Sequence, residues 1–197
     1  MYMPDFFNRE INLIQDEDLA YVVRGYITSE VPAYFWTDGA SSSGKYHPKM
    51  SQGVGGLVRH TKAVVKFAEE LLQMVPYVNM KQEYKDYVIA ACIVHDTVKY
   101  GSSNTPDRAE YKNHARNAAK AFHSLCLDYD YPVSDLLLNA VRSHMGQWST
   151  PREDAPFTLI DQCVHMADYM ASRSFIDIPS ITEEYEEVLN SPLPSEK

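Results

Sequence analysis

The segment YVIAACIV, from Tyr87 to Val94, is the feature that most restricts the fold. It is apolar on nearly every side when it is wound as a helix, and such helices are normally central and buried. The run is far shorter than the roughly 20 residues that cross a bilayer. Other parts of the chain must therefore cover it, and we expect a helix over residues 84–99 at the centre of the fold.

Helical spacing of apolar residues recurs elsewhere in the chain, separated by proline and polar loops. Helices are expected at residues 9–35 with a break near Pro32, and at 57–75, 106–125, 133–145, 157–173 and 180–197. Ser134 is a plausible N-cap, and Ser180 with Glu183 has the spacing of a capping box. Strand-like alternation is not found. The sequence predicts an all-α, single-domain helical bundle, a class that suits 197 residues.

Residues 37–56 form a long polar segment rich in serine and glycine, TDGASSSGKYHPKMSQGVGG. Loops of this length in compact domains are often functional. The segment divides an N-terminal helical region, 1–46, from a core at about 47–173 that carries the motifs described below. A short C-terminal helix at 180–197 completes the expected organisation.

Composition excludes some classes of function. The formal net charge is −9, from 18 basic and 27 acidic residues, without a basic run. Because clustered Lys and Arg hold long nucleic acids, duplex binding is disfavoured, whereas a small anionic substrate is not. The N-terminus lacks the features of a secretory signal, so a cytoplasmic protein is expected. Cys92, Cys126 and Cys163 are expected to be reduced core residues, since they are widely spaced.

His95 and Asp96 stand at the end of the most apolar segment. A buried carboxylate is costly unless it is paired, and either a metal ion or a buried Lys or Arg would meet that need. Further His and Asp residues fall on other expected helices or at their ends, and facing side chains of a bundle can build a metal site. They are His60, His114, His144 and Asp168. Imidazole with carboxylate suits divalent Mn, Fe, Co, Ni or Zn.

Four short motifs occur in a characteristic order: GGLVRHT, CIVHDTVK, SHMGQW and VHMADYMASR. The succession of a His, a His-Asp pair with HDxxK, and a distant Asp in an ADY segment resembles the HD-domain phosphohydrolase superfamily. The resemblance covers about residues 47–173. The first and last motifs are most similar to small bacterial and phage HD hydrolases. They are also similar to YqeK-type dinucleoside-tetraphosphate hydrolases and to the HD half of YhaM-type 3′–5′ exoribonucleases.

The resemblance implies that His60, His95, Asp96 and Asp168 hold one divalent metal ion. In relatives with two ions, extra histidines lie between the His-Asp pair and the last Asp. His114 and His144 occupy those places, and Asp96 would then bridge the ions. Alternatively, His114 is a solvent-facing helix residue and His144 interacts with a helix dipole.

The helix at 157–173 leaves two choices open. Asp161 is a rival to Asp168 as a ligand, although it fits a capping or supporting role better, and Ala167-Asp168-Tyr169 matches the family motif. His165 is either a support for the ligands or a plain helix-surface residue.

The expected chemistry is attack of a metal-activated water on phosphorus, with Asp96 at the centre and cations neutralising the phosphoryl oxygens. Lys99 is the best cation for that role, ahead of Arg173, while Arg59 is expected to point away. In similar hydrolases a His often precedes the glycine pair, so His47 is a candidate to face the substrate. Gln147 and Trp148 could line a base or sugar pocket, although core packing is an equal alternative for Trp148.

These features predict a metal-dependent phosphohydrolase acting on a nucleotide or a related small phosphate ester, without membrane attachment. Three alternatives stay open. They are a 3′–5′ exonuclease of short single strands, which needs a basic groove, a non-hydrolytic nucleotide-binding HD domain, and a structural coat or adaptor protein. The sequence leaves open whether the chain forms a homo-oligomer.

Overall fold

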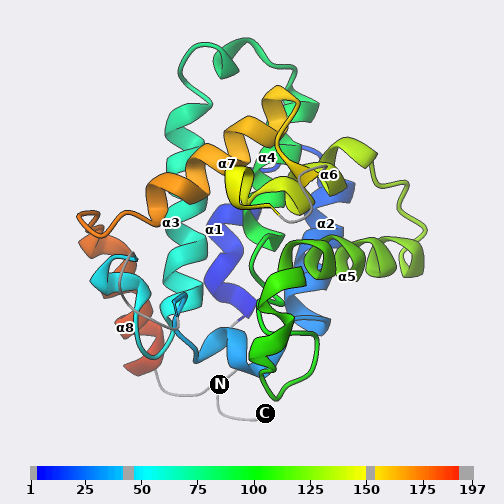
Figure 1. Cartoon of the computed structure of the whole chain (residues 1–197). Helices are drawn as coiled ribbons and strands as arrows, with labels where there is room; N and C mark the ends of the chain where they lie inside the picture. The colour runs from blue at the N-terminus through cyan, green and yellow to red at the C-terminus, as the bar shows by residue number, and fades with distance from the viewer. Residues whose placement is uncertain (1–3, 42–46, 150–153, 191–197) are drawn as a thin grey trace.

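The computed structural model describes residues 4–41, 47–149 and 154–190, and these residues contain helices and no strand (Figure 1). The prediction of an all-α fold is confirmed. The α-helices are α1 (Asn8–Ile11), α2 (Glu17–Ser29), α3 (Gly56–Leu71), α4 (Gln82–Val94), α5 (His114–Asp128), α6 (Asp135–Ser143), α7 (Leu159–Ala171) and α8 (Pro179–Asn190). The 3-10 helices are η1 (Pro4–Phe7), η2 (Ala33–Trp36), η3 (Lys49–Ser51), η4 (Tyr77–Asn79), η5 (Arg108–Asn113) and η6 (Gly146–Trp148).

Helix α4 is the central element, as its apolar sequence predicts. Every residue from Asp86 to Val94 is buried, and the helix contacts α1, α2, α3, α5, α6 and α7. Helices α3 and α7 pack against each other as well as against α4, and α5 packs on α6 (Figure 1). The buried apolar side chains form one cluster that runs from Phe6 to Tyr185. Helix α4 is thus the element around which the other helices pack.

The expected helix at 84–99 ends earlier than predicted, at Val94. The reason is competition for backbone carbonyls. His95 Nδ1 lies 2.7 Å from the Cys92 carbonyl, and the Thr97 hydroxyl donates to the Val94 carbonyl at 2.8 Å. Side chains thus take acceptors that a longer helix would use for its own N–H groups. The chain continues from His95 to Tyr100 as tight turns.

The N-terminal region is more divided than the prediction of one helix at 9–35. The break near Pro32 is confirmed, since α2 ends at Ser29 and η2 begins after Pro32. A second break separates α1 from α2. Asp16 causes it by accepting a hydrogen bond from the Leu19 N–H at 3.0 Å, which caps α2 at its N-terminus.

The other helix ends bear out some capping predictions and correct one. Ser134 accepts a hydrogen bond from the Leu136 N–H at 3.3 Å and caps α6 as expected. Helix α8 begins at Pro179, so Ser180 lies inside its first turn and is not the N-cap that was predicted. The expected helix at 106–125 begins as η5, and α5 starts only at His114. Residues 191–197 of the expected last helix lie outside the described part.

The polar segment at 37–56 is held in place where it is described, although residues 42–46 fall outside the described part. Arg59 points away from the ligands, as expected, and donates to the carbonyls of Met50, Gln52 and Val54. The Tyr185 hydroxyl of α8 donates to the Trp36 carbonyl at 3.1 Å. Gly55 has a φ of 70°, and a Cβ atom there would come within 2.0 Å of the Tyr185 ring. Helix α8 thus covers the turn that starts α3.

Two further expectations can be checked on the described residues. Cys92, Cys126 and Cys163 are buried and free, which confirms the interpretation as reduced core residues. Among the described helices, none combines the length and the apolar character that a membrane crossing requires.

Candidate metal centre

Six His and Asp side chains converge at the end of α4, and we call them the metal centre. His60 comes from the middle of α3, His95 and Asp96 from the turn after α4, and Asp168 from α7. His114 begins α5, and His144 directly follows α6. All are buried except Asp168, whose side chain is 15% exposed. The structure thus brings together every residue that the resemblance implied as a ligand.

Asp96 lies between two pairs of histidines and turns one carboxylate oxygen toward each pair. Its Oδ2 lies 3.7 Å from His60 Nε2 and 3.6 Å from His95 Nε2. Its Oδ1 lies 3.3 Å from His114 Nε2 and 3.7 Å from His144 Nε2. Asp96 is therefore common to two triads of potential ligand atoms, each of which fits within 4.8 Å.

Asp168 belongs to the first of these triads by position. Its Oδ1 lies 3.1 Å from His60 Nε2 and 4.0 Å from His95 Nε2. Asp161, its rival on the same helix, instead accepts hydrogen bonds from the N–H groups of Phe157 and Thr158, at 3.1 and 2.9 Å. Thr158 and Asp161 form a capping box, so Asp161 supports the start of α7.

Three of the histidines are oriented by their own backbone. His95 Nδ1 lies 2.7 Å from the Cys92 carbonyl, His114 Nδ1 lies 2.6 Å from that of Tyr111, and His144 Nδ1 lies 2.8 Å from that of Val141. A carbonyl can only accept, so each Nδ1 carries the proton. Each Nε2 then presents a lone pair to the metal centre. Ligating histidines are commonly fixed in this way.

Several buried polar atoms of the metal centre have no hydrogen-bond partner among the described residues. They are both ring nitrogens of His60, the Nε2 of His95 and the Oδ1 of Asp96. Unpaired buried polar atoms are costly, and cations bound at the two triads would satisfy the Nε2 atoms of His60 and His95 and the Oδ1 of Asp96. Four imidazoles and two carboxylates are the donor set that divalent transition metals prefer. The residues present therefore fit a metal ion.

Burial and neighbouring charges keep these groups in ligand-competent states. Burial, together with His114 and His95, lowers the pKa of His144 to about 3, and burial also lowers the pKa of His95. Burial alone would raise the pKa of Asp96, but Lys99 and His95 outweigh it and hold that pKa well below its ordinary value. Neutral imidazoles and ionised carboxylates are the forms that bind metals.

Lys99 is buried and contacts the metal centre directly. Its Nζ donates to Asp96 Oδ2 at 2.5 Å, and Asp96 raises the pKa of Lys99 although burial opposes this. The pairing answers part of the question raised by the sequence, because Asp96 has a cationic partner in addition to its histidines. Lys99 thus provides the buried cation that Asp96 needs, and its role beside a phosphoryl group stays a prediction.

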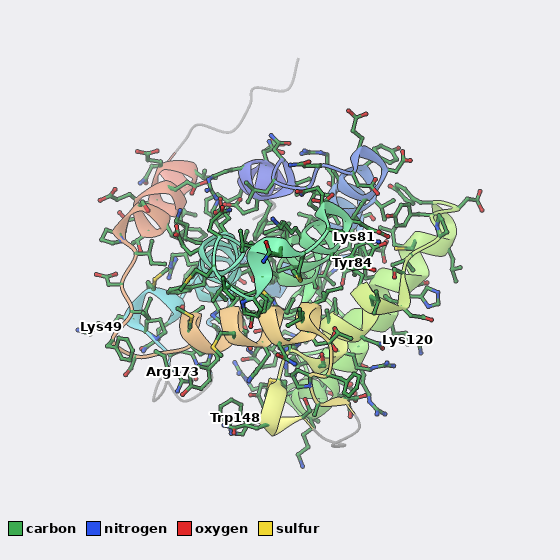
Figure 2. The ribbon with its side chains drawn as sticks, turned by 90° about the horizontal axis from the view of Figure 1, so that it is seen from above. Lys49, Lys81, Tyr84, Lys120, Trp148 and Arg173 are labelled. Atoms are coloured by element: carbon green, nitrogen blue, oxygen red, sulfur yellow. The ribbon has the colours of Figure 1, made fainter. Side chains whose placement is uncertain are left out.

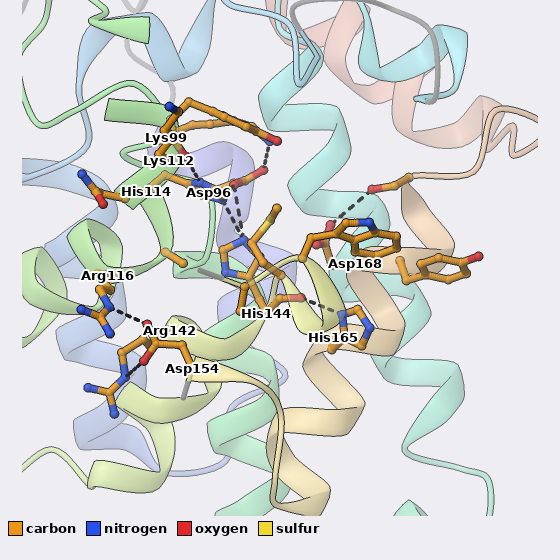
Figure 3. A pocket seen from close by; sticks show the side chains of 18 of the residues that line it. Asp96, Lys99, Lys112, His114, Arg116, Arg142, His144, Asp154, His165 and Asp168 are labelled. Carbon is orange, nitrogen blue, oxygen red and sulfur yellow. Dashed lines mark hydrogen bonds and ion pairs between the residues drawn. The ribbon is translucent and has the colours of Figure 1, made fainter. Parts of the chain in front are cut away.

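A pocket of about 860 Å³ opens onto the metal centre (Figure 3). Besides Lys99, four cationic side chains line it: Lys112, Arg116, Arg142 and Arg173. Arg116 and Arg142 flank the buried carboxylate of Asp154, and Arg142 Nε lies 3.4 Å from Asp154 Oδ1. In Figure 3 this group lies on one side of the centre, with Asp168 and His165 on the other. Cations thus collect at the pocket of an acidic chain.

The structure also locates the remaining candidates from the sequence. His47 lines the pocket with its ring centroid 5.3 Å from that of His60, and burial lowers its pKa to about 3. Trp148 and Arg173 line the pocket too. Trp148 is 51% exposed, so the alternative of core packing is wrong. Gln147 is exposed and lies outside the pocket lining.

Sequence reasoning missed several residues of the pocket. His165 was weighed only as a support, and its Nδ1 lies 2.8 Å from the His144 carbonyl while its ring lines the pocket. Tyr111 stacks on His114, with ring centroids 5.1 Å apart. A signal for Tyr111 and Arg142 existed, because each lies within one helical turn of a predicted ligand. Asp154 gave no such signal.

The central part of the chain matches the model of a protein family. Residues 57–173 match the family model of the HD domain, which is more than half of the chain. The chain belongs to the HD-domain family. This confirms the resemblance to the metal-dependent phosphohydrolase superfamily. No curated protein and no solved structure matches the chain, so its likeness to the YqeK and YhaM types stays a prediction.

Proposed function

We propose that this HD-domain protein hydrolyses a phosphate ester, and that its substrate is a nucleotide or a related small phosphorylated molecule. The observation that supports this most is the position of Asp96, shared by two histidine pairs at the floor of a cation-lined pocket. A divalent transition metal ion, when bound, polarises phosphoryl oxygens and lowers the pKa of a coordinated water. One or two ions fit the two triads.

The side chains of the protein have two further roles, which are to hold the metal ions and to neutralise the charge of the phosphoryl group. His60, His95, Asp96 and Asp168 would hold a first ion, and His114 and His144 with Asp96 a second. Lys99 is fixed against Asp96 at 2.5 Å, where its charge can neutralise a phosphoryl oxygen. The burial of the centre strengthens these electrostatic interactions.

The cationic side chains of the pocket favour a substrate with more than one negative charge. Lys112 lies beside Lys99, and Arg116 and Arg142 lie on the opposite side of His144 from Asp168 (Figure 3). A cavity of about 860 Å³ is within the range of small-molecule sites, roughly 300–1,000 Å³. Its size and the net charge of −9 favour a small phosphorylated molecule over a nucleic-acid strand.

The test compares two buried aspartates near the same helix. Asp96→Asn removes one charge from the metal centre. Asp86→Asn is the matched control, because Asp86 is equally buried and accepts structural hydrogen bonds from the Asp16 N–H and the Gln82 side chain. Elemental analysis and hydrolysis of a panel of phosphate esters are measured for both variants with Mn²⁺, Fe²⁺, Co²⁺, Ni²⁺, Zn²⁺ or Mg²⁺.

We expect the Asp96→Asn protein to lose bound metal and to hydrolyse no faster than the metal-free wild type. The Asp86→Asn protein is expected to keep both properties. Equal hydrolysis by the wild type and Asp96→Asn, or no hydrolysis by the wild type with any of these metals, would contradict the proposal. Faster cleavage of a labelled oligonucleotide than of any nucleotide would instead favour an exonuclease.

A further inference from the structure

The wall of the pocket beside Asp168 exposes a large aromatic side chain. Trp148 is 51% exposed, whereas Trp36, the other tryptophan, is 1% exposed in the core. Trp148 lies nearly parallel to Tyr169, with an interplanar angle of 9° and ring centroids 5.9 Å apart. Both rings line the pocket. An aromatic face that is open toward a ligand cavity is an unused stacking surface.

A cation completes this surface. The guanidinium carbon of Arg173 lies 4.0 Å from the centroid of the Tyr169 ring, and Arg173 Nε donates to the Tyr169 carbonyl at 3.0 Å. Figure 2 shows Trp148 and Arg173 on the same side of α7. We call Trp148, Tyr169 and Arg173 the aromatic platform.

The aromatic platform is fixed relative to the metal centre by the turn after α6. Gly146 has a φ of 60°, and a Cβ atom there would come within 2.0 Å of the His165 ring. His165 Nδ1 is within 2.8 Å of the carbonyl of His144, and its ring centroid lies 6.2 Å from that of Trp148. The same turn therefore carries a predicted metal ligand and, four residues later, the exposed tryptophan.

We propose that the aromatic platform binds the base of a free nucleotide by stacking, with its phosphates directed over the metal centre. This inference rests on the proposed function, since it names the part of the substrate that distinguishes it from other phosphate esters. Every nucleobase has a flat π face, so stacking accepts all of them. The platform adjoins Asp168, while Arg116 and Arg142 of the same pocket lie on the opposite side of the metal centre (Figure 3). The pocket thus has an aromatic end and a cationic end, which complement the aromatic base and the anionic phosphates of a nucleotide.

Trp148 provides its own probe. The protein is titrated in EDTA, which prevents turnover, with AMP, GMP, CMP, UMP and ribose 5-phosphate while tryptophan fluorescence is recorded. We expect the nucleotides to quench the fluorescence, purines at the lowest concentrations, and ribose 5-phosphate to leave it unchanged. In Trp148→Phe the quenching is lost, because the remaining Trp36 is buried.

Variants test whether the stacking contact matters for the substrate. Trp148→Ala should lower the ratio of kcat/KM for AMP to that for ribose 5-phosphate by about tenfold, whereas Trp148→Phe, which keeps a ring, should restore most of it. Phe157→Ala is the matched control. Phe157 is an aromatic residue that is 88% exposed just before α7 and lies outside the pocket lining, so the ratio should not change.

The possible outcomes distinguish the proposal of base stacking on the aromatic platform from the proposal of hydrolysis. Hydrolysis with no difference between AMP and ribose 5-phosphate, and no quenching by any of the four nucleotides, overturns the platform and leaves the hydrolase proposal intact. Quenching by nucleotides without hydrolysis of any ester supports the platform and contradicts the hydrolase. A single-stranded five-nucleotide DNA that binds far more tightly than AMP overturns the assignment to a free nucleotide.

Discussion

Helix α3 carries two buried polar side chains, two residues apart, whose partners differ in kind. Lys62 Nζ donates to the Phe6 carbonyl at 2.8 Å, to Glu10 Oε2 at 3.1 Å and to Glu184 Oε1 at 2.6 Å. Its three protons are used up within the protein. Both nitrogens of His60 lack a hydrogen bond among the described residues, although two carboxylates lie nearby.

The comparison separates a structural cluster from a functional one. We call Lys62, Glu10 and Glu184 the Lys62 cluster; it joins η1 and α1 to α3 and α8. Opposite charges there satisfy one another, so nothing further is needed. The metal centre holds Lys99 against Asp96, yet several of its buried acceptors still lack a donor, and a bound cation would stabilise them. Burial alone does not reveal a site, whereas buried acceptors without donors do.

The largest effect on stability is expected when the Lys62 cluster is broken. Lys62→Met removes the buried cation from the carboxylate of Glu10, which is 2% exposed, and leaves it the half-exposed Arg9 at 3.4 Å. We expect a loss of about 3–5 kcal/mol in the free energy of unfolding, measured by denaturant titration. Bound metal per folded molecule should stay unchanged. The double variant Glu10→Gln/Lys62→Met should regain much of the loss, and metal loss in the single variant would show that the two clusters are not independent.

A smaller effect is expected when the metal-free metal centre is acidified. The unfolded chain takes up a proton on each histidine near pH 6.5, whereas the pKa of His144 in the folded chain is about 3. Between these values the unfolded state binds more protons, so the free energy of unfolding falls as the pH falls. His144 alone contributes a loss of about 2 kcal/mol at pH 5. Denaturant titrations of the chelated protein at pH 7 and pH 5 measure it.

His144→Gln provides the control for acidification, because it should reduce the difference between the two pH values by that amount. A wild-type protein that is equally stable at pH 7 and pH 5 without metal would contradict the interpretation of His144 as a neutral imidazole.

The smallest effect is expected in α7, which contains a structural acid, Asp161, and an acid of the metal centre, Asp168. These two residues allow the same comparison between a structural and a functional group within one helix. Thr158→Ala removes half of the capping box that Asp161 completes. We expect a loss of about 1 kcal/mol in the free energy of unfolding and full metal content. Asp168→Asn should do the reverse, with the metal lost and the cap preserved. Metal loss in Thr158→Ala would show that the cap and the metal centre are coupled.

Much of the metal centre could be predicted because its residues stand in local patterns. The apolar run before His95 indicates a buried helix, and the order of the motifs places His60 and Asp168 beside it. The ends of the helices were harder to predict from the sequence. Helix α4 ends early because the side chains of His95 and Thr97 form hydrogen bonds with its last backbone carbonyls. The spacing of hydrophobic residues in the sequence gives no sign of these bonds.

The pocket was harder to predict than the metal centre. Gln147 and Trp148 are neighbours in sequence, and only Trp148 lines the pocket, since the turn at Gly146 decides which side chain faces inward. Arg116 of α5 and Arg142 of α6 both contact Asp154, which lies between η6 and α7. Their pairing depends on tertiary contacts between segments that are far apart in sequence.

The backbone carbonyls that orient His95, His114 and His144 each lie three residues before their imidazole. The position of the proton on each of these three imidazoles is therefore fixed within four consecutive residues, by a contact that needs no distant part of the chain. His60, without such a carbonyl, is the exception: its tautomer depends on the assembled site.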